Sequence, residues 1–411
     1  MRILIFVDSF LPPAYLPRIR YFCSYFAQKG WKVDLVTEYF VSQDRIPTEV
    51  SSLVIDYYKY RKGWKYRIEW LLKFVINLIT DHKGYYFYTQ SRQFTKDKQY
   101  DFVFCSTYFT FPLTTAAKAA RKLQIPLFVD LRDIVEQFPD DNPFITHKLP
   151  GFAGKIIAAL YKKISVLRRN KVLKTAAAVT TVSPWHVDAL LAYNPNTHLL
   201  YNGYDEQVFI PEKLSADKFV VSYYGRLYTE KVRNPRLLFQ AISRLQNKGI
   251  LTPENTVLQW FIDKQSSDVI SAMTDEYGLK DFTVYRDFVT QNILTDEINK
   301  SSVVLVLCNH DPGKQYSGIM TTKVFEAIGL NRPVLCVPDN KDNLADLIRE
   351  TNCGIVSSDV DEVENFLLTK FTEWQQLGHT QGMLSDTVRL KYSRKNGAEI
   401  LENLILNTIA L

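Results

Sequence analysis

The sequence predicts an α/β protein with two successive doubly wound domains, each built on a parallel sheet. The chain has 411 residues, which is about two to three times the usual size of a single domain. Short apolar runs alternate with segments of helical periodicity in both halves, as is typical of parallel strands covered by helices. A mainly polar stretch at residues 202–215, containing Gly203 and Pro211, separates the two halves.

The first half alternates predicted strands with helical segments. A segment of helical periodicity at residues 18–29 follows the first strand, and an insertion rich in aromatic and basic residues occupies residues 57–92. Nearly continuous apolar strands of this kind are buried on both faces of their sheet. The predicted strands are residues 3–7, 33–37, 102–106, 126–131, 178–183 and 199–201.

The second half repeats this alternation, and we therefore place the domains at residues 1–205 and 206–385. Doubly wound sheets bind ligands beyond the carboxyl ends of their strands, so we expect the site in a cleft between the two domains. The predicted strands of this half are residues 219–224, 257–261, 283–285, 303–308 and 334–337, and its predicted helices are residues 234–247, 266–277, 321–330 and 342–350.

The composition indicates a folded protein of a reducing compartment. Apolar residues make up 46% and charged residues 23% of the chain, which excludes a disordered or collagen-like protein. The five cysteines form no C-x-x-C pair, and most lie in apolar runs, as core residues of cytoplasmic proteins do. Asp8 ends the first apolar run before it reaches the length of a signal-peptide core, and no run reaches the about 18 residues of a membrane span. We therefore expect a cytoplasmic protein.

Two clusters in the second half are candidates for binding a nucleotide. The first follows the strand that ends at residue 224 and contains Gly225, Arg226 and Lys231. Two cations just beyond a strand end can hold a diphosphate, Arg226 through its planar fork and Lys231 as a point charge. The alternative is a solvated loop with ordinary surface charges.

The second cluster begins at Gly318, which permits a tight loop. Thr321 or Thr322 suits the N-cap of the next helix, whose free N–H groups attract an anion. Glu326 projects from the same helix face as Thr322, and a carboxylate there can accept two hydrogen bonds from the vicinal hydroxyls of a ribose. The alternative is a helix that carries a surface acid.

These clusters, with the N-G-x-D segment at residues 202–205, resemble glycosyltransferases of family 4, which have the GT-B fold. The resemblance implies two doubly wound Rossmann-like domains that face each other across a cleft, and a helix at residues 386–411 that crosses back to the first domain. It also implies a retaining, metal-independent enzyme. The residues that it implies for the donor diphosphate and ribose are Arg226, Lys231, Thr322, Lys323 and, for the ribose, Glu326.

One position departs from the pattern of many relatives. They carry a second glutamate eight residues before the ribose-binding one, where this chain has Gly318. Because that glutamate often contacts the donor sugar, the identity of the sugar stays open. We expect Gly318, Ile319 and His310 around the donor sugar, although a lone histidine is more often structural.

Two segments of the first domain are candidates for the reaction itself. Arg132 and Asp133 resemble the family's D-x-R-D element, in which Asp133 would orient the acceptor hydroxyl or take its proton and Arg132 would stabilise phosphate charge. An exposed loop with an internal ion pair is the alternative. After the first strand, Arg18 or Arg20 is a candidate for a phosphate contact, unless either only caps a turn that faces solvent.

No metal site is predicted, because the six histidines form no i,i+4 pair and no D-x-D motif occurs. We expect no cofactor beyond the donor substrate.

Eight Lys or Arg and no acid lie between Asn142 and His186, in a segment where Lys155, Lys162 and Arg169 recur opposite Ile156, Leu160, Ile164 and Leu167. This basic amphipathic helix suits an anionic membrane surface or packing on its own domain with a solvated basic face. Nucleic acid is not expected, since no recognised module accompanies the charges.

The predicted function is transfer of a hexose from a nucleoside diphosphate sugar to a hydroxyl of a glycan precursor. We expect the precursor to be lipid-linked, in the assembly of a cell-surface polysaccharide, with the enzyme peripheral on the inner face of the cell membrane. A nucleotide-sugar epimerase of GT-B fold and a catalytically silent nucleotide-sugar-binding module are the alternatives. The nucleobase, the sugar, the acceptor and the oligomeric state stay open.

Overall fold

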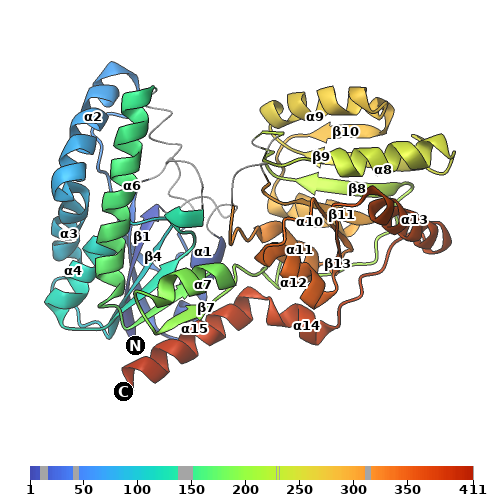
Figure 1. Cartoon of the computed structure of the whole chain (residues 1–411). Coiled ribbons are helices and arrows are strands. Elements are labelled where there is room, and N and C mark those ends of the chain that lie inside the picture. Colours follow the sequence, from blue (N-terminus) through green and yellow to red (C-terminus); the bar gives the residue numbers. More distant parts are fainter. Residues whose placement is uncertain are drawn as a thin grey trace. The chain divides into compact units, whose positions relative to one another are not determined.

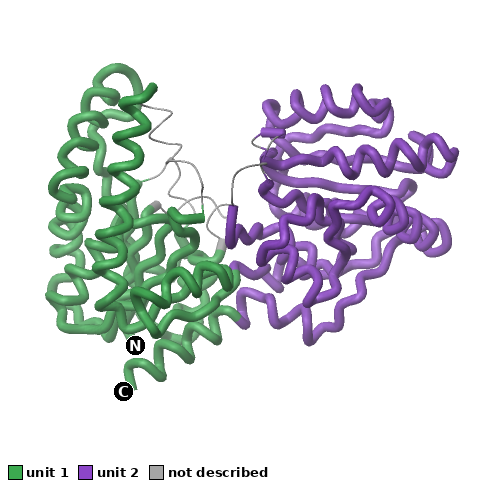
Figure 2. Tube along the Cα trace, in the orientation of Figure 1, with its two compact units in different colours: residues 1–201, 397–411 green, residues 202–396 purple. Residues whose placement is uncertain are grey.

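A computed structural model describes residues 1–9, 17–39, 46–137, 151–227, 229–230, 232–310 and 316–410. The chain forms two compact units, which Figure 2 shows in different colours. Unit 1 contains residues Met1–Tyr201 and Gly397–Leu411, and unit 2 contains Asn202–Asn396. The predicted domains meet at residue 205, a few residues after the first of these boundaries, and the predicted return of the chain begins at residue 386, before the second.

Unit 1 contains a seven-stranded parallel sheet with the strand order β3-β2-β1-β4-β5-β6-β7. Ile5 in the interior strand β1 is in register with Leu35 on one side and Phe104 on the other. The strands are β1 (Arg2–Ser9), β2 (Lys32–Glu38), β3 (Ser51–Ile55), β4 (Phe102–Thr107), β5 (Leu127–Leu131), β6 (Ala178–Thr181) and β7 (Thr197–Leu199).

Helices cover both faces of this sheet (Figure 1) because its strands are apolar on both sides. Ile3 and Ile5 pack with α1 and α15, whereas Leu4 and Phe6 pack with α3 and α4 on the other face. The helices of unit 1 are α1 (Pro17–Gln28), α2 (Gly63–Thr80), α3 (His82–Thr95), α4 (Leu113–Leu123), α6 (Phe152–Leu173), α7 (Pro184–Leu191) and most of α15 (Arg394–Ile409); a 3₁₀ turn spans Val135–Gln137.

Unit 2 contains a six-stranded parallel sheet with the order β10-β9-β8-β11-β12-β13. One large cluster around Trp260 forms the core on one face, between the sheet and helices α8, α9 and α13. The strands are β8 (Phe219–Tyr224), β9 (Thr256–Phe261), β10 (Thr283–Arg286), β11 (Val303–Leu307), β12 (Val334–Val337) and β13 (Gly354–Val356). The helices are α8 (Arg236–Asn247), α9 (Lys264–Glu276), α10 (Gln291–Asn299), α11 (Thr322–Gly329), α12 (Asn343–Thr351), α13 (Val360–Leu377) and α14 (Asp386–Lys391).

The N-G-x-D segment joins the beginning of unit 2 to its end. Gly203 has φ +63, and a Cβ there would lie 2.9 Å from the carbonyl oxygen of Tyr392. Tyr204 donates its N–H to that same oxygen and accepts the N–H of Arg394. From there α15 continues into unit 1, where Leu401 packs in the core. The glycine is therefore required by a positive φ and by a close approach of two chain segments.

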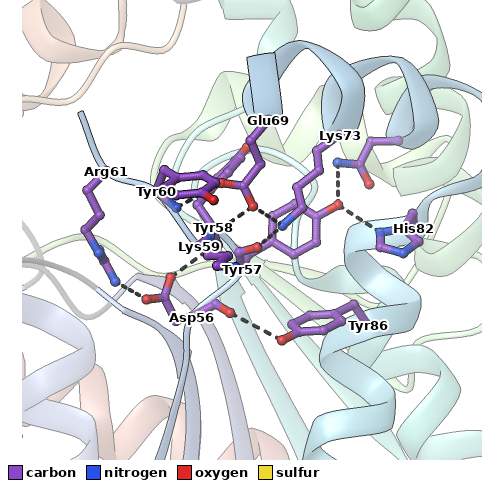
Figure 3. A network of polar contacts seen from close by, with 11 residues as sticks. Asp56, Tyr57, Tyr58, Lys59, Tyr60, Arg61, Glu69, Lys73, His82 and Tyr86 are labelled. Carbon is purple, nitrogen blue, oxygen red and sulfur yellow. Dashed lines mark hydrogen bonds and ion pairs between the residues drawn. The ribbon is translucent and has the colours of Figure 1, made fainter. Parts of the chain in front are cut away.

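The aromatic and basic insertion forms α2 and α3, which meet at Asp81. Figure 3 shows the polar network that holds their junction to the end of β3. The Tyr57 hydroxyl contacts Nδ1 of His82 at 2.9 Å and accepts from the Asn77 amide at 3.2 Å. Lys73 donates to Tyr57 O and forms an ion pair of 2.8 Å with Glu69.

Within the described part of the chain, no helix is both long enough and apolar enough to cross a membrane.

Candidate functional site

The two predicted nucleotide-binding clusters meet at the carboxyl end of β8. Gly225, the first residue after that strand, has φ +125, and a Cβ there would lie 2.4 Å from Cε and 2.5 Å from Nζ of Lys323. The ammonium group of Lys323 therefore lies against the backbone of residue 225. Glycine is needed there because of the positive φ and because a side chain would displace the lysine.

Two contacts hold the amino end of α11 at this place. Thr321 is its N-cap, and its hydroxyl accepts the N–H of Lys323 at 3.5 Å. The hydroxyl of Tyr224, the last residue of β8, donates to the carbonyl oxygen of Lys323 at 3.1 Å. Thr322 is the first residue of the helix, so its N–H belongs to the turn that has no carbonyl partner within the helix. The end of this helix is thus a place suited to an anion.

The charges of α11 are shifted by their surroundings. Burial and the neighbouring Arg233 cation lower the pKa of Lys323 to about 7. Burial raises the pKa of Glu326, and the cations of Arg394 and Lys323 oppose that rise. An anionic ligand beside Lys323 would restore its charge, because an opposite charge favours the protonated ammonium.

Arg226 projects from the loop after β8. Its side chain is 51% exposed, and its Nε lies 3.3 Å from Oδ2 of Asp263. Its carbonyl oxygen accepts hydrogen bonds from the Tyr223 hydroxyl at 2.9 Å and from Arg233 at 2.5 Å, which fix the loop backbone. Lys231, the second predicted cation of this loop, lies outside the described residues.

The loop at Gly318 is held by an aspartate that the sequence analysis did not single out. The N–H of Gly318, which has φ +69, donates to Oδ2 of Asp342 at 2.8 Å. Burial raises the pKa of Asp342, while hydrogen bonds from the backbone N–H groups of Asn343, Gly318 and Ile319 lower it. The only signal in the sequence was the position of Asp342 as the first residue of a predicted helix. His310 is exposed, and its N–H donates to the carbonyl oxygen of Val232 at 2.9 Å.

The sequence predicts that Arg18 contacts phosphate, but the structure buries its side chain inside unit 1. Its side chain is 2% exposed, forms an ion pair with Asp130, and donates to the carbonyl oxygen of Leu200 at 2.6 Å. Asp130 also accepts from the hydroxyls of Ser106 at 2.8 Å and Thr180 at 2.7 Å. Both charges are therefore used inside unit 1, and the structure does not support the prediction that Arg18 contacts phosphate.

The predicted catalytic pair lies beyond the end of β5. Arg132 forms an ion pair of 2.6 Å with Asp8 at the end of β1, which gives it a structural partner in the same unit. Asp133 accepts a hydrogen bond of 2.6 Å from Gln137. Burial raises the pKa of Asp133 to about 6, against the opposing effects of this hydrogen bond and the Arg132 charge. A carboxyl group with a pKa near 6 can exchange a proton near neutral pH.

A cavity of about 410 Å³ lies at the same edge of the unit 1 sheet. Asp8, Glu38, Tyr108 and Val135, each at or just beyond a strand end, form one part of its lining. Side chains of α2, α3 and α6 contribute Trp70, Phe74, Lys83, Tyr161 and Lys162, and α4 and the residues before it also line the cavity. The cavity is thus rich in aromatic side chains and carries charges of both signs. Among the described residues, no three His, Cys, Asp or Glu side chains are grouped as a metal site.

No protein-family model and no curated protein matches the sequence. Solved structures do match over the whole chain. Sucrose-phosphate synthase from Thermosynechococcus elongatus is 15% identical, with a TM-score of 0.64 and coverage of 100% of both chains. Anabaena HepE in complex with UDP-glucose is 14% identical, with a TM-score of 0.62 over 99% of this chain and 100% of that one. A glycosyltransferase from Rickettsia africae ESF-5 is 10% identical, with a TM-score of 0.64 over 99% of this chain and 98% of that one.

The chain has the GT-B fold. Membership of family 4 rests on the sequence motifs alone. In this GT-B chain each unit carries one candidate region at the carboxyl ends of its strands. Unit 2 has the region around Gly225 and Lys323, and unit 1 has the region around Asp8 and Arg132.

Proposed function

We propose that this protein is a retaining glycosyltransferase that moves a hexose from a nucleoside diphosphate sugar to an acceptor hydroxyl. The observation that carries the proposal is the position of Lys323 against Gly225 at the amino end of α11, with Glu326 one turn further on. A cation and free N–H groups suit a diphosphate, and a carboxylate suits ribose hydroxyls. The fold agrees with this function, since neighbours of this fold are described in complexes with UDP and with UDP-glucose.

On the donor side, Arg226, Lys231, Lys323 and the N–H of Thr322 bind the diphosphate. Glu326 accepts hydrogen bonds from the ribose hydroxyls, and the loop of Gly318 and Ile319, with His310, borders the sugar. The bond between the anomeric carbon and the phosphate oxygen breaks during transfer, and negative charge develops on the leaving diphosphate. Fixed cations and N–H groups stabilise that charge as it forms. No metal takes part in this proposal.

On the acceptor side, the reaction forms a bond between the acceptor oxygen and the anomeric carbon of the donor. The hydroxyl proton leaves either to the Asp133 carboxylate or to the departing diphosphate. We assign Asp133 to orienting the hydroxyl, and Arg132, held by Asp8, to stabilising phosphate charge nearby. The aromatic cavity of unit 1 suits the sugar faces of a glycan precursor. We propose a lipid-linked precursor of a cell-surface polysaccharide, used at the inner face of the cell membrane.

A thermal-shift screen across nucleoside diphosphates tests the donor site first. A ligand at 100 times its Kd stabilises the native state by about 2.7 kcal/mol, which such a screen detects. Turnover of the matching nucleotide sugar is then followed with and without glycan acceptors. Acceptor-dependent release of the diphosphate supports a transferase, whereas acceptor-independent formation of a new sugar indicates an epimerase. Binding with no turnover under any condition indicates a silent module.

A further inference from the structure

Helices α2 and α6 form a pair on the outside of unit 1. They run side by side (Figure 1), with Phe74 of α2 stacked on Trp70 at 5.1 Å and on Tyr161 of α6 at 5.6 Å. Arg168 of α6 donates to the carbonyl oxygens of Asn77 at 2.8 Å and Leu78 at 3.1 Å, near the end of α2. Phe74 is the only buried residue among the 18 of α2.

The outer side of this pair is apolar. Of the 24 large apolar side chains that are exposed in the described part of the chain, eleven belong to these two helices, with exposed fractions between 42% and 80%. Their spacing follows the helical repeat, so each helix carries one continuous stripe. We call these residues the α2–α6 face. They are Trp64, Ile68, Leu71, Leu72, Val75, Ile76 and Ile79 on α2, and Phe152, Ile156, Leu160 and Leu167 on α6.

The side of α6 that packs on unit 1 carries polar as well as small and apolar residues, while large apolar residues lie on its exposed side. Arg169 is 1% exposed and forms an ion pair of 2.5 Å with Glu136, and Ser165 and Asn170 are also buried. Lys155, Lys162 and Arg169 therefore do not share one solvated face, which corrects the sequence-based expectation. Ile156, like the other apolar residues of the stripe, is exposed instead. An apolar stripe that its own unit leaves exposed is typical of an interaction site.

The exposed charges on this pair are positive. Lys65, Arg67, Lys155 and Lys163 are all exposed, and α6 contains no acidic residue. Glu69 is the one acid of α2, and its carboxylate is occupied by Lys73 and by the backbone N–H groups of Lys59 and Tyr60. An apolar surface edged by cations complements an anionic bilayer. Two copies of the same surface would place cations against cations.

We propose that the α2–α6 face docks on an anionic lipid bilayer, with its apolar side chains at the headgroup–acyl boundary and its cations at the lipid phosphates. Helices that lie in the interface bury their apolar side about 5–10 Å deep and do not cross the bilayer. The proposal stands independently of the proposed transferase activity, because it rests on unit 1 surface residues outside the donor region.

Docking would also bring the unit 1 cavity close to the lipid. The same two helices supply Trp70, Phe74, Tyr161 and Lys162 to its lining. A helix with its side chains is about 10–12 Å wide, so the cavity would lie within roughly that distance of the headgroups. If the proposed function holds, a lipid-linked acceptor reaches the cavity without leaving the membrane.

Vesicle flotation with matched variants tests the docking surface. The test variant is Ile68→Glu with Leu160→Glu, whose side chains are 51% and 46% exposed. The control is Ile293→Glu with Leu377→Glu, which matches the test variant in residue types and in exposed fractions, 51% and 46%, but lies in unit 2. We expect the wild type and the control to float with phosphatidylglycerol-containing vesicles at 0.1 M salt. The test variant should lose at least tenfold in partitioning.

The electrostatic part is tested with neutral vesicles and with salt. Binding should be weaker to pure phosphatidylcholine and should fall at 1 M salt, where the Debye length is about 3 Å instead of about 10 Å at 0.1 M. Trp64, at 68% exposure, reports insertion directly. Brominated acyl chains should quench wild-type fluorescence, and Trp64→Phe should remove most of that quenching.

Three results would overturn the proposal. The wild type could fail to float with anionic vesicles, or the test variant and the control could float equally. The third is a wild type that forms dimers without lipid, in sedimentation, while the test variant stays monomeric, since the face then serves a second copy. Circular dichroism and thermal unfolding of both variants establish that they fold. Nucleoside diphosphate binding is measured on the same samples, so failure of docking is distinguished from failure of the proposed function.

Discussion

Nζ of Lys323 lies 2.5 Å from the place that a Cβ of residue 225 would occupy, so the lysine and Gly225 share one small space at the end of β8. Two motifs from distant parts of the sequence thereby become one site. The arrangement gives a prediction that does not require removing any charged group.

Gly225→Ala should weaken nucleoside diphosphate binding by at least tenfold, because the new methyl group displaces the Lys323 ammonium. Isothermal titration calorimetry measures the change. Gly249→Ala is the matched control: Gly249 also has a positive φ, +68, but nothing lies within 4 Å of the added Cβ. The control also places an alanine at a positive φ and should keep its affinity. Equal losses in both variants would show that strain, and not the lysine contact, causes the effect.

Donor binding should weaken as the pH rises. The free protein holds Lys323 with a pKa lowered to about 7 by burial and by Arg233. Above pH 7 that lysine is mostly neutral, so binding an anion must take up a proton, and affinity falls by at most about tenfold per pH unit. A nucleotide sugar is the suitable ligand, since its phosphates do not titrate in this range. Lys323→Arg stays charged and should give a flat profile; a similarly sloping profile in that variant would contradict the assignment.

Glu326→Gln should weaken binding of a nucleoside diphosphate and leave binding of inorganic pyrophosphate nearly intact. Only the carboxylate that would accept the ribose hydroxyls has changed, and a charge-assisted hydrogen bond contributes about 1.5–3 kcal/mol. Calorimetry with both ligands measures the difference. Equal losses for the two ligands would indicate that Glu326 acts through the charge of Lys323 or through the fold.

Arg18→Met should lower the free energy of unfolding by about 3–5 kcal/mol, because it leaves the buried Asp130 carboxylate without its cation. Nucleotide affinity should not change. Arg244→Met is the control, since Arg244 is 47% exposed beside Asp361 and a surface pair contributes about 0–1 kcal/mol. Denaturant unfolding and calorimetry separate the two effects. A stable Arg18→Met variant with weakened nucleotide binding would restore Arg18 as a phosphate contact.

Asp133→Asn should reduce transfer while increasing stability at pH 7. The folded protein raises the pKa of Asp133 from 3.8 to about 6, so it holds more protons than the unfolded chain between those pH values. Wild-type stability therefore falls as the pH rises through this window, by about 1–3 kcal/mol. The variant lacks this loss of stability, whereas losing the carboxylate that orients the acceptor hydroxyl or takes its proton should lower the rate, by about 10²–10⁴-fold if it acts as the base. Unchanged transfer in a stabilised variant would show that Asp133 has no catalytic role.

Strands with a continuous apolar run were predictable, and short half-exposed ones were not. Residues 3–7 and 303–308 are continuous apolar runs, and these runs predicted strands. In the structure they form β1 and β11, and every residue of both runs is buried. β3 and β13 were missed, since both are short and most of their residues are partly exposed. Position in a sheet, not local sequence, makes these segments strands.

The candidate site was predictable in its residue types but not in its contacts. The spacing of Arg226 and Glu326 was visible in the sequence, but the approach of Lys323 to Gly225 depends on two strands being neighbours. The burial of Arg18 and Arg169 could not be predicted from the sequence, for a related reason. Each cation is buried because an acid, Asp130 or Glu136, arrives from a distant segment. Helical periodicity shows that α6 has two sides, but not which side its partners cover.

The hydrogen bonds between Tyr204 and the segment around Tyr392 make unit 2 a cassette whose two ends adjoin. The two points of unit 1 at which unit 2 is inserted are also close together, since a Cβ on Gly397 would lie 3.7 Å from Leu200. A module with adjoining ends can be exchanged through a single gene insertion without disturbing the sheet of its host. The ligand choice proposed for unit 2 and the surface attachment proposed for unit 1 would therefore be free to evolve separately, by recombination as well as by point mutation.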